Sequence, residues 1–299
     1  MKRIIPVIAI LLIFAVGIGF LAYPLVSSVV NNISARNEAE VNIQKVAQTD
    51  EAKIDALFAE ADEYNHSLVS TIILTDPFDP ESYEKIGAHY RETFNVDENG
   101  LIGYVTVPKI NVYLPIYHGT SKEVLDKAAG HLANTSLPVG GPSTHSIISA
   151  HTGFPTETFF DYLTDLEVGD EFFIKVLNRT LKYEVDQIKV IEPDDTSDLY
   201  VIDGEDHVTL LTCTPYGLNT HRLIVRGTRA PYEEKEDEDK VASVSVENGF
   251  IYLFGYRVSF LAAGLILAAF LLVIAAVVFF VIRSNRKKAA RHKQQKDGG

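Results

Sequence analysis

The chain of 299 residues is poor in cysteine, with Cys213 as its single thiol. One thiol cannot form a disulfide within the chain, and it cannot supply the cysteine cluster of a structural metal site. Neither an HExxH pattern nor an EF-hand loop occurs, so we expect no metal and no cofactor. Basic residues are also scarce, with 27 Lys and Arg against 40 Asp and Glu and a net charge of −13. This balance argues against a chain-wide nucleic-acid-binding surface.

Two long segments contain no charged residue at all. These are Ile4–Leu25 and Val258–Ile282. A helix of about 20 apolar residues crosses a bilayer, so we predict a membrane anchor within residues 1–36 and a transmembrane helix at 258–282. A cleaved signal peptide is the alternative for the first segment. It is longer than the ~7–15 apolar residues of such signals, however, and no A-x-A cleavage site follows it.

The charges that flank these segments predict an orientation in the lipid membrane. Residues 283–299 hold seven Lys and Arg against Asp297 alone, and Lys2 and Arg3 precede the first segment. The positive-inside rule therefore places both termini in the cytoplasm and the acidic middle outside the cell. The basic tail could also bind lipid headgroups, but a flank of a transmembrane helix needs no further role.

Residues 37–100 are predicted to form an N-terminal helical region and a turn. The first part lacks Gly and Pro up to Ser67, and Ile54, Leu57, Phe58 and Ala61 follow helical spacing, which indicates one or two amphipathic helices. The later sequence TDPFDP has two prolines within four residues, which forbids a regular helix and favours an ordered turn.

Residues 101–232 have the texture of a mainly β domain, a barrel or a sandwich. Seven short segments rich in β-branched and aromatic residues are bounded by Gly, Pro, Asn and Asp. The predicted strands are Tyr104–Ile110, Val112–Tyr117, His145–His151, Glu171–Leu177, Leu181–Pro193, His207–Cys213 and Arg222–Gly227. A short helix is expected around Asp161–Leu166. Residues 233–257 begin with EEKEDEDK and are interpreted as an acidic, solvated linker that does not pack.

The single cysteine stands at the end of an apolar segment. Cys213 closes VTLLTC and precedes a turn-rich loop with Pro215, Gly217 and Asn219. A buried free cysteine that acts as a small apolar residue is one interpretation. A residue between a strand and a loop also lies at the rim of a core, where reactive groups are held on a rigid support. Cys213 is therefore a candidate nucleophile.

Arg222 and one histidine are candidates for the groups that such a nucleophile needs. If VTLLTC and RLIVRG pair as antiparallel strands, Cys213 and Arg222 meet at the mouth of one hairpin. A guanidinium there lowers a thiol pKa and offers donors to an oxyanion, although alone it would suggest a surface ion pair. A proton donor is normally histidine. Of His145, His151 and His221, which flank apolar segments, His151 is best placed, because it ends SIISA and precedes a turn.

These residues lie in motifs that resemble those of sortases, the membrane-anchored cysteine transpeptidases of Gram-positive bacteria. TLLTC resembles the family's TLxTC signature, and PYGLNTHRLIVRG resembles the segment that carries its arginine. IGYVTVPKINVYLPIYHGT, HLANTSLPVGG and AHTGFP follow in family order, with Asn134 where Gly is expected. The resemblance implies a closed sortase β-barrel with short helices, preceded by the helical and lid region and flanked by two transmembrane helices. It implies Cys213 as nucleophile, His151 as acid/base and Arg222 as oxyanion or substrate group.

Two features resemble class C, the pilin-polymerising sortases. One is the predicted C-terminal anchor, and the other is TDPFDP, which is similar to the lid motif of that class. The resemblance implies that Asp76, Pro77 and Phe78 form a lid, with Asp76 facing Arg222 and Phe78 over Cys213. On its own the motif would be explained equally well by a turn that packs Phe78 on the domain.

The resemblance also implies a reaction and its partners. Cys213 would cleave an LPxTG-like sorting signal of a pilin through a thioester, and a lysine of another pilin subunit would resolve it to an isopeptide bond. The alternatives are a sortase that attaches surface proteins to peptidoglycan and a non-catalytic membrane-anchored β-domain for adhesion or scaffolding. The last leaves the single cysteine and the THRL sequence unexplained.

Overall fold

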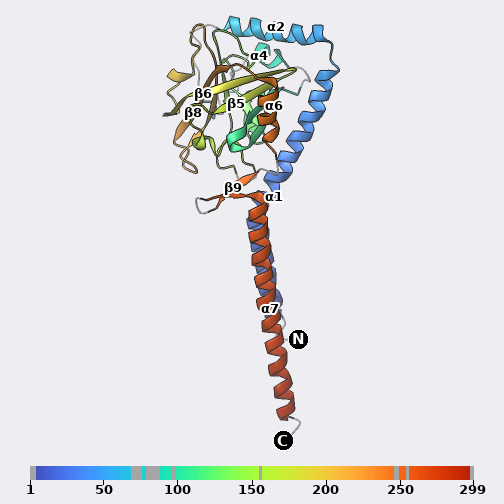
Figure 1. Cartoon of the computed structure of the whole chain (residues 1–299). Helices are drawn as coiled ribbons and strands as arrows, with labels where there is room; N and C mark the ends of the chain where they lie inside the picture. Colours follow the sequence, from blue (N-terminus) through green and yellow to red (C-terminus); the bar gives the residue numbers. More distant parts are fainter. Residues whose placement is uncertain are drawn as a thin grey trace. The chain divides into compact units, whose positions relative to one another are not determined.

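The computed structural model describes residues 5–68, 76–78, 88–95, 99–154, 157–245, 249–253 and 256–296. The chain forms two compact units, Met1–Val246 and Glu247–Gly299. The described residues at the start of the first unit include the helices α1 (Ile5–Ala47), α2 (Glu51–Ser67) and α4 (Ala88–Glu92), which Figure 1 labels. The predicted helices after residue 37 are thus confirmed, and α2 buries Ile54, Phe58 and Ala61.

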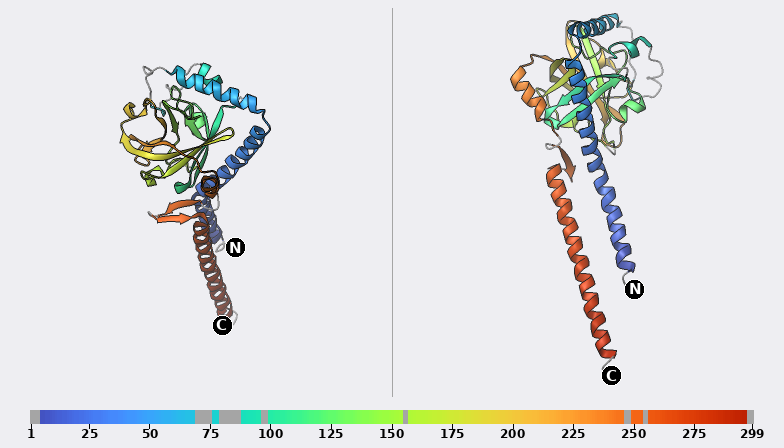
Figure 2. Two further views of the ribbon diagram at one scale, coloured as in Figure 1. Left: turned by 45° about the horizontal axis from the view of Figure 1, so that its top comes forward. Right: turned by 90° about the vertical axis from the view of Figure 1, so that its right-hand side faces the viewer.

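Eight strands of the first unit close into a barrel, as the mainly β pattern predicts. Their order around it is β1-β2-β3-β4-β7-β8-β6-β5, and β5 pairs back with β1. Figure 2 shows the barrel in two further views. The strands are β1 (Leu101–Val107), β2 (Val112–His118), β3 (Ala129–His131), β4 (Thr144–Ser149), β5 (Glu171–Val176), β6 (Arg179–Ile191), β7 (Asp206–Thr214) and β8 (His221–Ala230). Short helices join them: η1 (Pro108–Ile110), α5 (Lys122–Leu125), η2 (Leu163–Asp165) and η3 (Ser197–Leu199).

Strand β3 is the barrel strand that the sequence does not predict. Its three residues Ala-Gly-His have no β-branched or aromatic character. It pairs in parallel with β2 and antiparallel with β4, so its neighbours supply the backbone hydrogen bonds that stabilise it. The expected short helix near Asp161 is present as η2.

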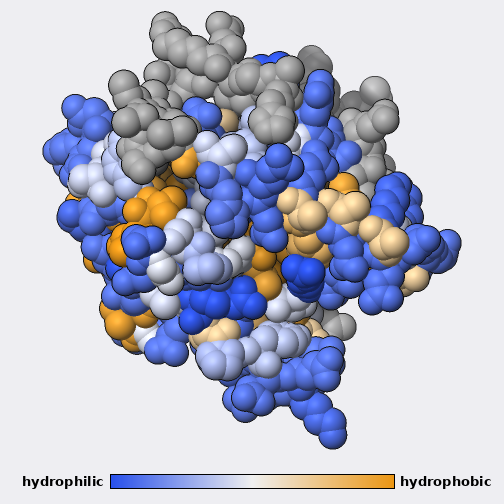
Figure 3. Space-filling model, turned by 90° about the horizontal axis from the view of Figure 1, so that it is seen from above, coloured by the Kyte–Doolittle hydropathy of each residue, from blue (hydrophilic) through white to orange (hydrophobic). Residues whose placement is uncertain are grey.

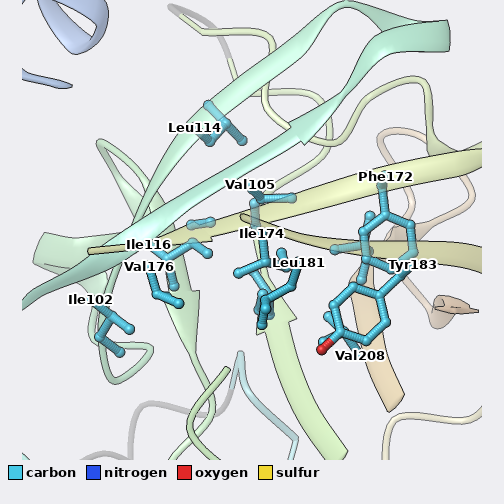
Figure 4. Packing of buried hydrophobic residues seen from close by; sticks show 14 of the residues in the cluster. Ile102, Val105, Leu114, Ile116, Phe172, Ile174, Val176, Leu181, Tyr183 and Val208 are labelled. Carbon is cyan, nitrogen blue, oxygen red and sulfur yellow. The ribbon is translucent and has the colours of Figure 1, made fainter. Parts of the chain in front are cut away.

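Side chains of the strands alternate between the barrel interior and an outer face. Ile148, Leu210 and Val225 belong to the interior core, part of which Figure 4 shows. Ile147, Leu211 and Ile224 belong instead to a second cluster on the outside of the same three strands, together with Leu132, Ile191 and Leu199. A sheet buried on both faces produces such continuous apolar runs. Figure 3 shows one face of the molecule, on which most of the coloured residues are hydrophilic and the apolar ones form separate groups.

The acidic segment after the barrel is a packed helix, so its interpretation as an unpacked linker is wrong. Helix α6 (Glu234–Ser243) buries Asp237 completely. The Asp237 carboxylate accepts a hydrogen bond from the Glu233 N–H at 2.7 Å and pairs with Lys182 at 3.1 Å and Lys240 at 3.3 Å. Burial alone raises the pKa of Asp237, but these bonds outweigh it and lower the pKa. Basic partners distant in sequence thus allow an acidic helix to pack.

The second unit contains a hairpin and a long helix. Strands β9 (Phe250–Leu253) and β10 (Tyr256–Ser259) pair antiparallel, although no strand is predicted there. Helix α7 (Phe260–Lys296) begins directly after β10 and continues through the basic tail. Among the described residues, one helical stretch is long and apolar enough to cross a membrane, Phe260–Phe280. The apolar segment near the N-terminus lies in α1, and its crossing of a membrane stays a prediction.

Candidate active site

The antiparallel pairing of β7 and β8 brings Cys213 and Arg222 together. The two residues are direct partners in the register, and the Thr214–His221 pair closes the ladder after them. The hairpin predicted from VTLLTC and RLIVRG is therefore present. Both side chains project from the outer face, two residues along from the Leu211–Ile224 pair of the outer cluster. Cys213 is buried and free.

Strand β4 delivers His151 to the same end of the barrel. It runs parallel to β7, with Ser149 paired to Leu211, and the Ala150 N–H donates to the Leu211 carbonyl at 3.1 Å. His151 and Cys213 each lie two residues beyond the Ser149–Leu211 pair, on neighbouring parallel strands. The three residues predicted for the site thus come from β7, from β8 and from the segment that directly follows β4.

The lid residues lie against this site. The Asp76 carboxylate accepts hydrogen bonds from Arg222, from Nε at 2.9 Å and from Nη2 at 2.5 Å. Pro77 is buried, and the Phe78 N–H donates to Asp76 Oδ1 at 3.3 Å, which closes the turn. The predicted contact between Asp76 and Arg222 is present. The flanking residues Thr75, Asp79 and Pro80 of TDPFDP lie outside the described residues.

The His151 ring lies between two aromatic rings. Phe78 of the lid is 5.5 Å away between centroids, and Phe154 stacks on His151 at 5.4 Å with the ring planes 6° apart. Phe78 also lies 5.2 Å from the Arg222 guanidinium, and it packs against the outer cluster. The ring of Phe78 therefore contacts both the arginine and the histidine, and it packs on the outer cluster beside them.

Arg222 has all of its donor nitrogens engaged. Besides the two bonds to Asp76, Nη1 donates to the carbonyls of Asn219 and His221 at 3.1 and 2.9 Å. An arginine held in this way is fixed in place by its own loop and by the lid. Four of its five N–H donors are thus engaged, two of them by Asp76, and one Nη2–H donor is left.

Burial sets the protonation of the site with the lid in place. It raises the pKa of Cys213 to about 11, against the lowering effect of Arg222 and together with the raising effect of Asp76. Burial also lowers the pKa of His151, although Asp126 after α5 opposes this. At neutral pH the pair is therefore a neutral thiol and a neutral imidazole. This protonation state disfavours the thiolate, which is the nucleophilic form of a cysteine.

The other histidines of the barrel have structural partners. His131 is fully buried and binds the Tyr90 hydroxyl and the Ser136 carbonyl. His145 binds the Thr209 hydroxyl at 2.7 Å on the same outer face, at the end of the strand away from Cys213. His221 contacts Glu192 at 3.2 Å. Within the part of the chain that the structure describes, no group of three metal-ligating side chains occurs.

The loop after His151 is a part of the site that sequence reasoning missed. The Phe160 N–H donates to the His151 carbonyl at 3.0 Å, and Asp161 accepts a bond from the Gly153 N–H. Phe154 contacts Phe159 at 5.5 Å, which anchors the ring that stacks on His151. The signal was the aromatic residue three positions after His151, but spacing alone does not tell a stacking ring from an ordinary core residue.

Comparisons with known proteins show which family this chain resembles. The Sortase domain family matches residues 105–230. The crystal structure of sortase C-1 from Streptococcus pneumoniae is 46% identical, with a TM-score of 0.62, and the match covers 66% of this chain and 100% of that one. A pilus-related sortase C of Group B Streptococcus is 45% identical, with a TM-score of 0.58, over 67% and 97% of the two chains. Sortase D of Bacillus subtilis (strain 168) is 28% identical over 48% of this chain and 70% of that protein.

Proposed function

The chain belongs to the sortase family of cysteine transpeptidases, and we propose that it acts as a class C sortase that joins pilin subunits. The observation that carries this proposal is the contact between Asp76 and Arg222 beside Cys213. A lid that holds the arginine would keep the site closed until the protein substrate binds. The Asn134 departure from the family motif does not weaken it, because Asn134 has a φ of 66°, a left-handed conformation that Asn tolerates well.

In the proposed reaction Cys213 attacks the threonine carbonyl of an LPxTG-like sorting signal. Departure of the lid frees the Nε and Nη2 donors of Arg222, which then stabilise the oxyanion of the tetrahedral intermediate. Loss of the Asp76 charge and of the covering Phe78 ring also favours the thiolate, since burial and Asp76 are what raise the thiol pKa. The Cys213 thiol gives its proton to His151 as the thiolate forms, and when the C–N bond to glycine breaks His151 transfers that proton to the departing amine.

The second half of the reaction resolves the thioester. A lysine ε-amine of another pilin subunit attacks the acyl carbon, His151 accepts its proton, and the Cys213 sulfur leaves as thiolate. An isopeptide bond forms as the thioester breaks, and the proton on His151 returns to the Cys213 thiolate, so the enzyme regains its starting state. Phe154 stays stacked on His151 in this scheme, because the described contacts tie it to the loop after His151 and not to the lid.

The acceptor distinguishes this function from peptidoglycan anchoring. The full-length enzyme is given an LPxTG-like peptide and two competing acceptors, a pilin domain and a peptidoglycan stem peptide, at equal concentration. We expect the lysine-linked product to dominate, and mass spectrometry identifies it. Exclusive transfer to the stem peptide would assign the chain to cell-wall anchoring instead.

We further propose that the barrel lies outside the cell and that both termini are cytoplasmic. The apolar stretch Phe260–Phe280 and the basic residues after it support the C-terminal half of this arrangement. The apolar segment of α1 supports the other half by composition. Protease added to intact cells should cleave the chain between residues 37 and 257, as it does after detergent lysis, and cleavage that occurs only after lysis would contradict the orientation.

A further inference from the structure

A buried serine hydroxyl lies beside the candidate nucleophile without a hydrogen-bond partner. Ser149 of β4 is fully buried, and its Oγ contacts no donor or acceptor among the described residues. A buried polar group without a partner costs free energy, so native structures rarely keep one without a reason. The strand therefore retains a group that weakens the folded state as it stands with the lid closed.

The position of Ser149 links it to the site rather than to the barrel interior. It shares the outer face with Ile147 and lies two residues before His151, which follows β4. Its register partner on β7 is Leu211, two residues before Cys213. On its other side β3 supplies Gly130, which has no side chain that could bind the hydroxyl.

The neighbours of Ser149 belong to the outer cluster on which the lid packs. Phe78 is packed against the outer cluster that contains Ile147 and Leu211, and its ring lies 5.5 Å from His151. Removal of the Phe78 ring would expose the part of the outer cluster that surrounds Ser149. The hydroxyl would then be accessible on the surface that carries Cys213, His151 and the outer cluster, where an extended peptide substrate would bind.

We infer that Ser149 is a substrate-binding residue whose hydroxyl hydrogen-bonds the backbone of the acyl-donor peptide after the lid opens. An extended peptide presents N–H and C=O groups along its length, and either one can pair with a hydroxyl, which both donates and accepts. Apolar side chains of the peptide would pack on the outer cluster in place of Phe78. This inference rests on the proposed function, because it takes a sorting-signal peptide as the ligand.

The chain contains a matched control on the same strand. Ser146 also has a buried Oγ without a partner among the described residues, but its register partner Val208 belongs to the interior core. It therefore lies on the opposite face of β4 from Ser149. Ser146→Ala and Ser149→Ala remove the same group from the same kind of burial, and only the second one removes it from the outer face beside Cys213.

The test compares the two variants in the full chain with an LPxTG-like fluorogenic peptide. For Ser149→Ala we expect kcat/KM to fall about tenfold, mainly through KM, because a hydrogen bond to the peptide backbone is made in the ground state and in the transition state alike. Ser146→Ala should stay within about twofold of the wild type. Neither variant should unfold at a lower urea concentration, since each loses an unpartnered hydroxyl.

The outcomes separate the two proposals. Equal kcat/KM for wild type and Ser149→Ala, or equal losses in both variants, overturns the role of Ser149 and leaves the transpeptidase intact. A loss in Ser149→Ala that comes with a lower urea midpoint also overturns it, since the hydroxyl would then be structural. Wild-type enzyme that forms no acyl-enzyme with the peptide refutes the proposed function, and the binding role of Ser149 with it.

Discussion

Replacement of Asp76 by asparagine removes the charge that holds Arg222 while it keeps the shape of the side chain. The wild-type pair has two hydrogen bonds, at 2.9 and 2.5 Å, and both side chains are largely shielded, with exposed fractions of 9% for Arg222 and 18% for Asp76. Asp76→Asn should therefore shift the lid towards its open state and make Cys213 accessible to a thiol reagent.

The size of the shift follows from the geometry of the pair. Hydrogen bonds to charged groups contribute roughly 1.5–3 kcal/mol net, and partial exposure keeps this pair from exceeding that range. Each 1.4 kcal/mol is a factor of ten in an equilibrium constant, so opening should increase by about 10- to 100-fold. The loss of Asp76 also removes a charge that raises the pKa of Cys213, which increases the thiolate fraction in the same direction.

The assay is the rate of alkylation of Cys213, the single thiol of the chain, measured from pH 6 to pH 10. A change in opening scales the rate at every pH, whereas a change in the thiol pKa shifts its midpoint, so the two effects can be separated. Asp186→Asn is the matched control. Asp186 of β6 binds Arg226, which lies on β8 as Arg222 does, through three hydrogen bonds of 2.7 to 3.2 Å, away from the Cys213 end.

Alkylation of Asp76→Asn at the wild-type rate, with Asp186→Asn also unchanged, would refute the lid. Equal acceleration in both variants would point to general loosening of the barrel and would also count against it. Only a rate increase confined to Asp76→Asn agrees with a contact that closes the site.

Two further predictions concern histidines. Phe154→Leu keeps an apolar side chain beside His151 but removes the ring face that stabilises the cationic form of the histidine. The basic limb of the pH profile of kcat/KM should therefore move to lower pH, and kcat should fall about two- to fivefold. An unchanged pH profile would exclude this role of Phe154. Burial lowers the pKa of His131 to about 3 and that of His145 to about 4. As the pH falls, these histidines therefore bind protons in the unfolded chain before they do so in the folded one. Stability should be full above about pH 6.5 and fall as the pH drops towards 4, by up to ~1.4 kcal/mol per unit for each histidine. Urea midpoints at pH 7 and pH 5 measure this, and equal midpoints would contradict it.

The parts of the site that lie on regular strands could be predicted from sequence. Cys213 and Arg222 end and begin two apolar segments separated by a turn-rich loop, so antiparallel pairing makes them opposite each other. The place of His151 follows from the same logic once β4 and β7 are neighbours. The contact of Asp76 with Arg222 spans 146 positions, and it was predicted through family resemblance rather than from local pattern.

Contacts that depend on distant partners could not be predicted. Helix α6 looks like a solvated charge run, and only Lys182, 55 positions earlier, explains why Asp237 is buried there. Strand β3 has no intrinsic strand preference and exists because β2 and β4 flank it. The stacking of Phe154 on His151 depends on how the loop after His151 folds back, which Asp161 and Phe160 determine by bonds to Gly153 and His151.

The central claim is that Cys213 carries the acyl group, and mass spectrometry of the trapped enzyme tests it most directly. The full-length protein is incubated with an LPxTG-like peptide without an acceptor amine, and the intact mass and the modified residue are determined. We predict an increase equal to the acyl part of the peptide, located on Cys213, released by hydroxylamine and absent in Cys213→Ala. An adduct on another residue, or one that persists in Cys213→Ala, would contradict the account.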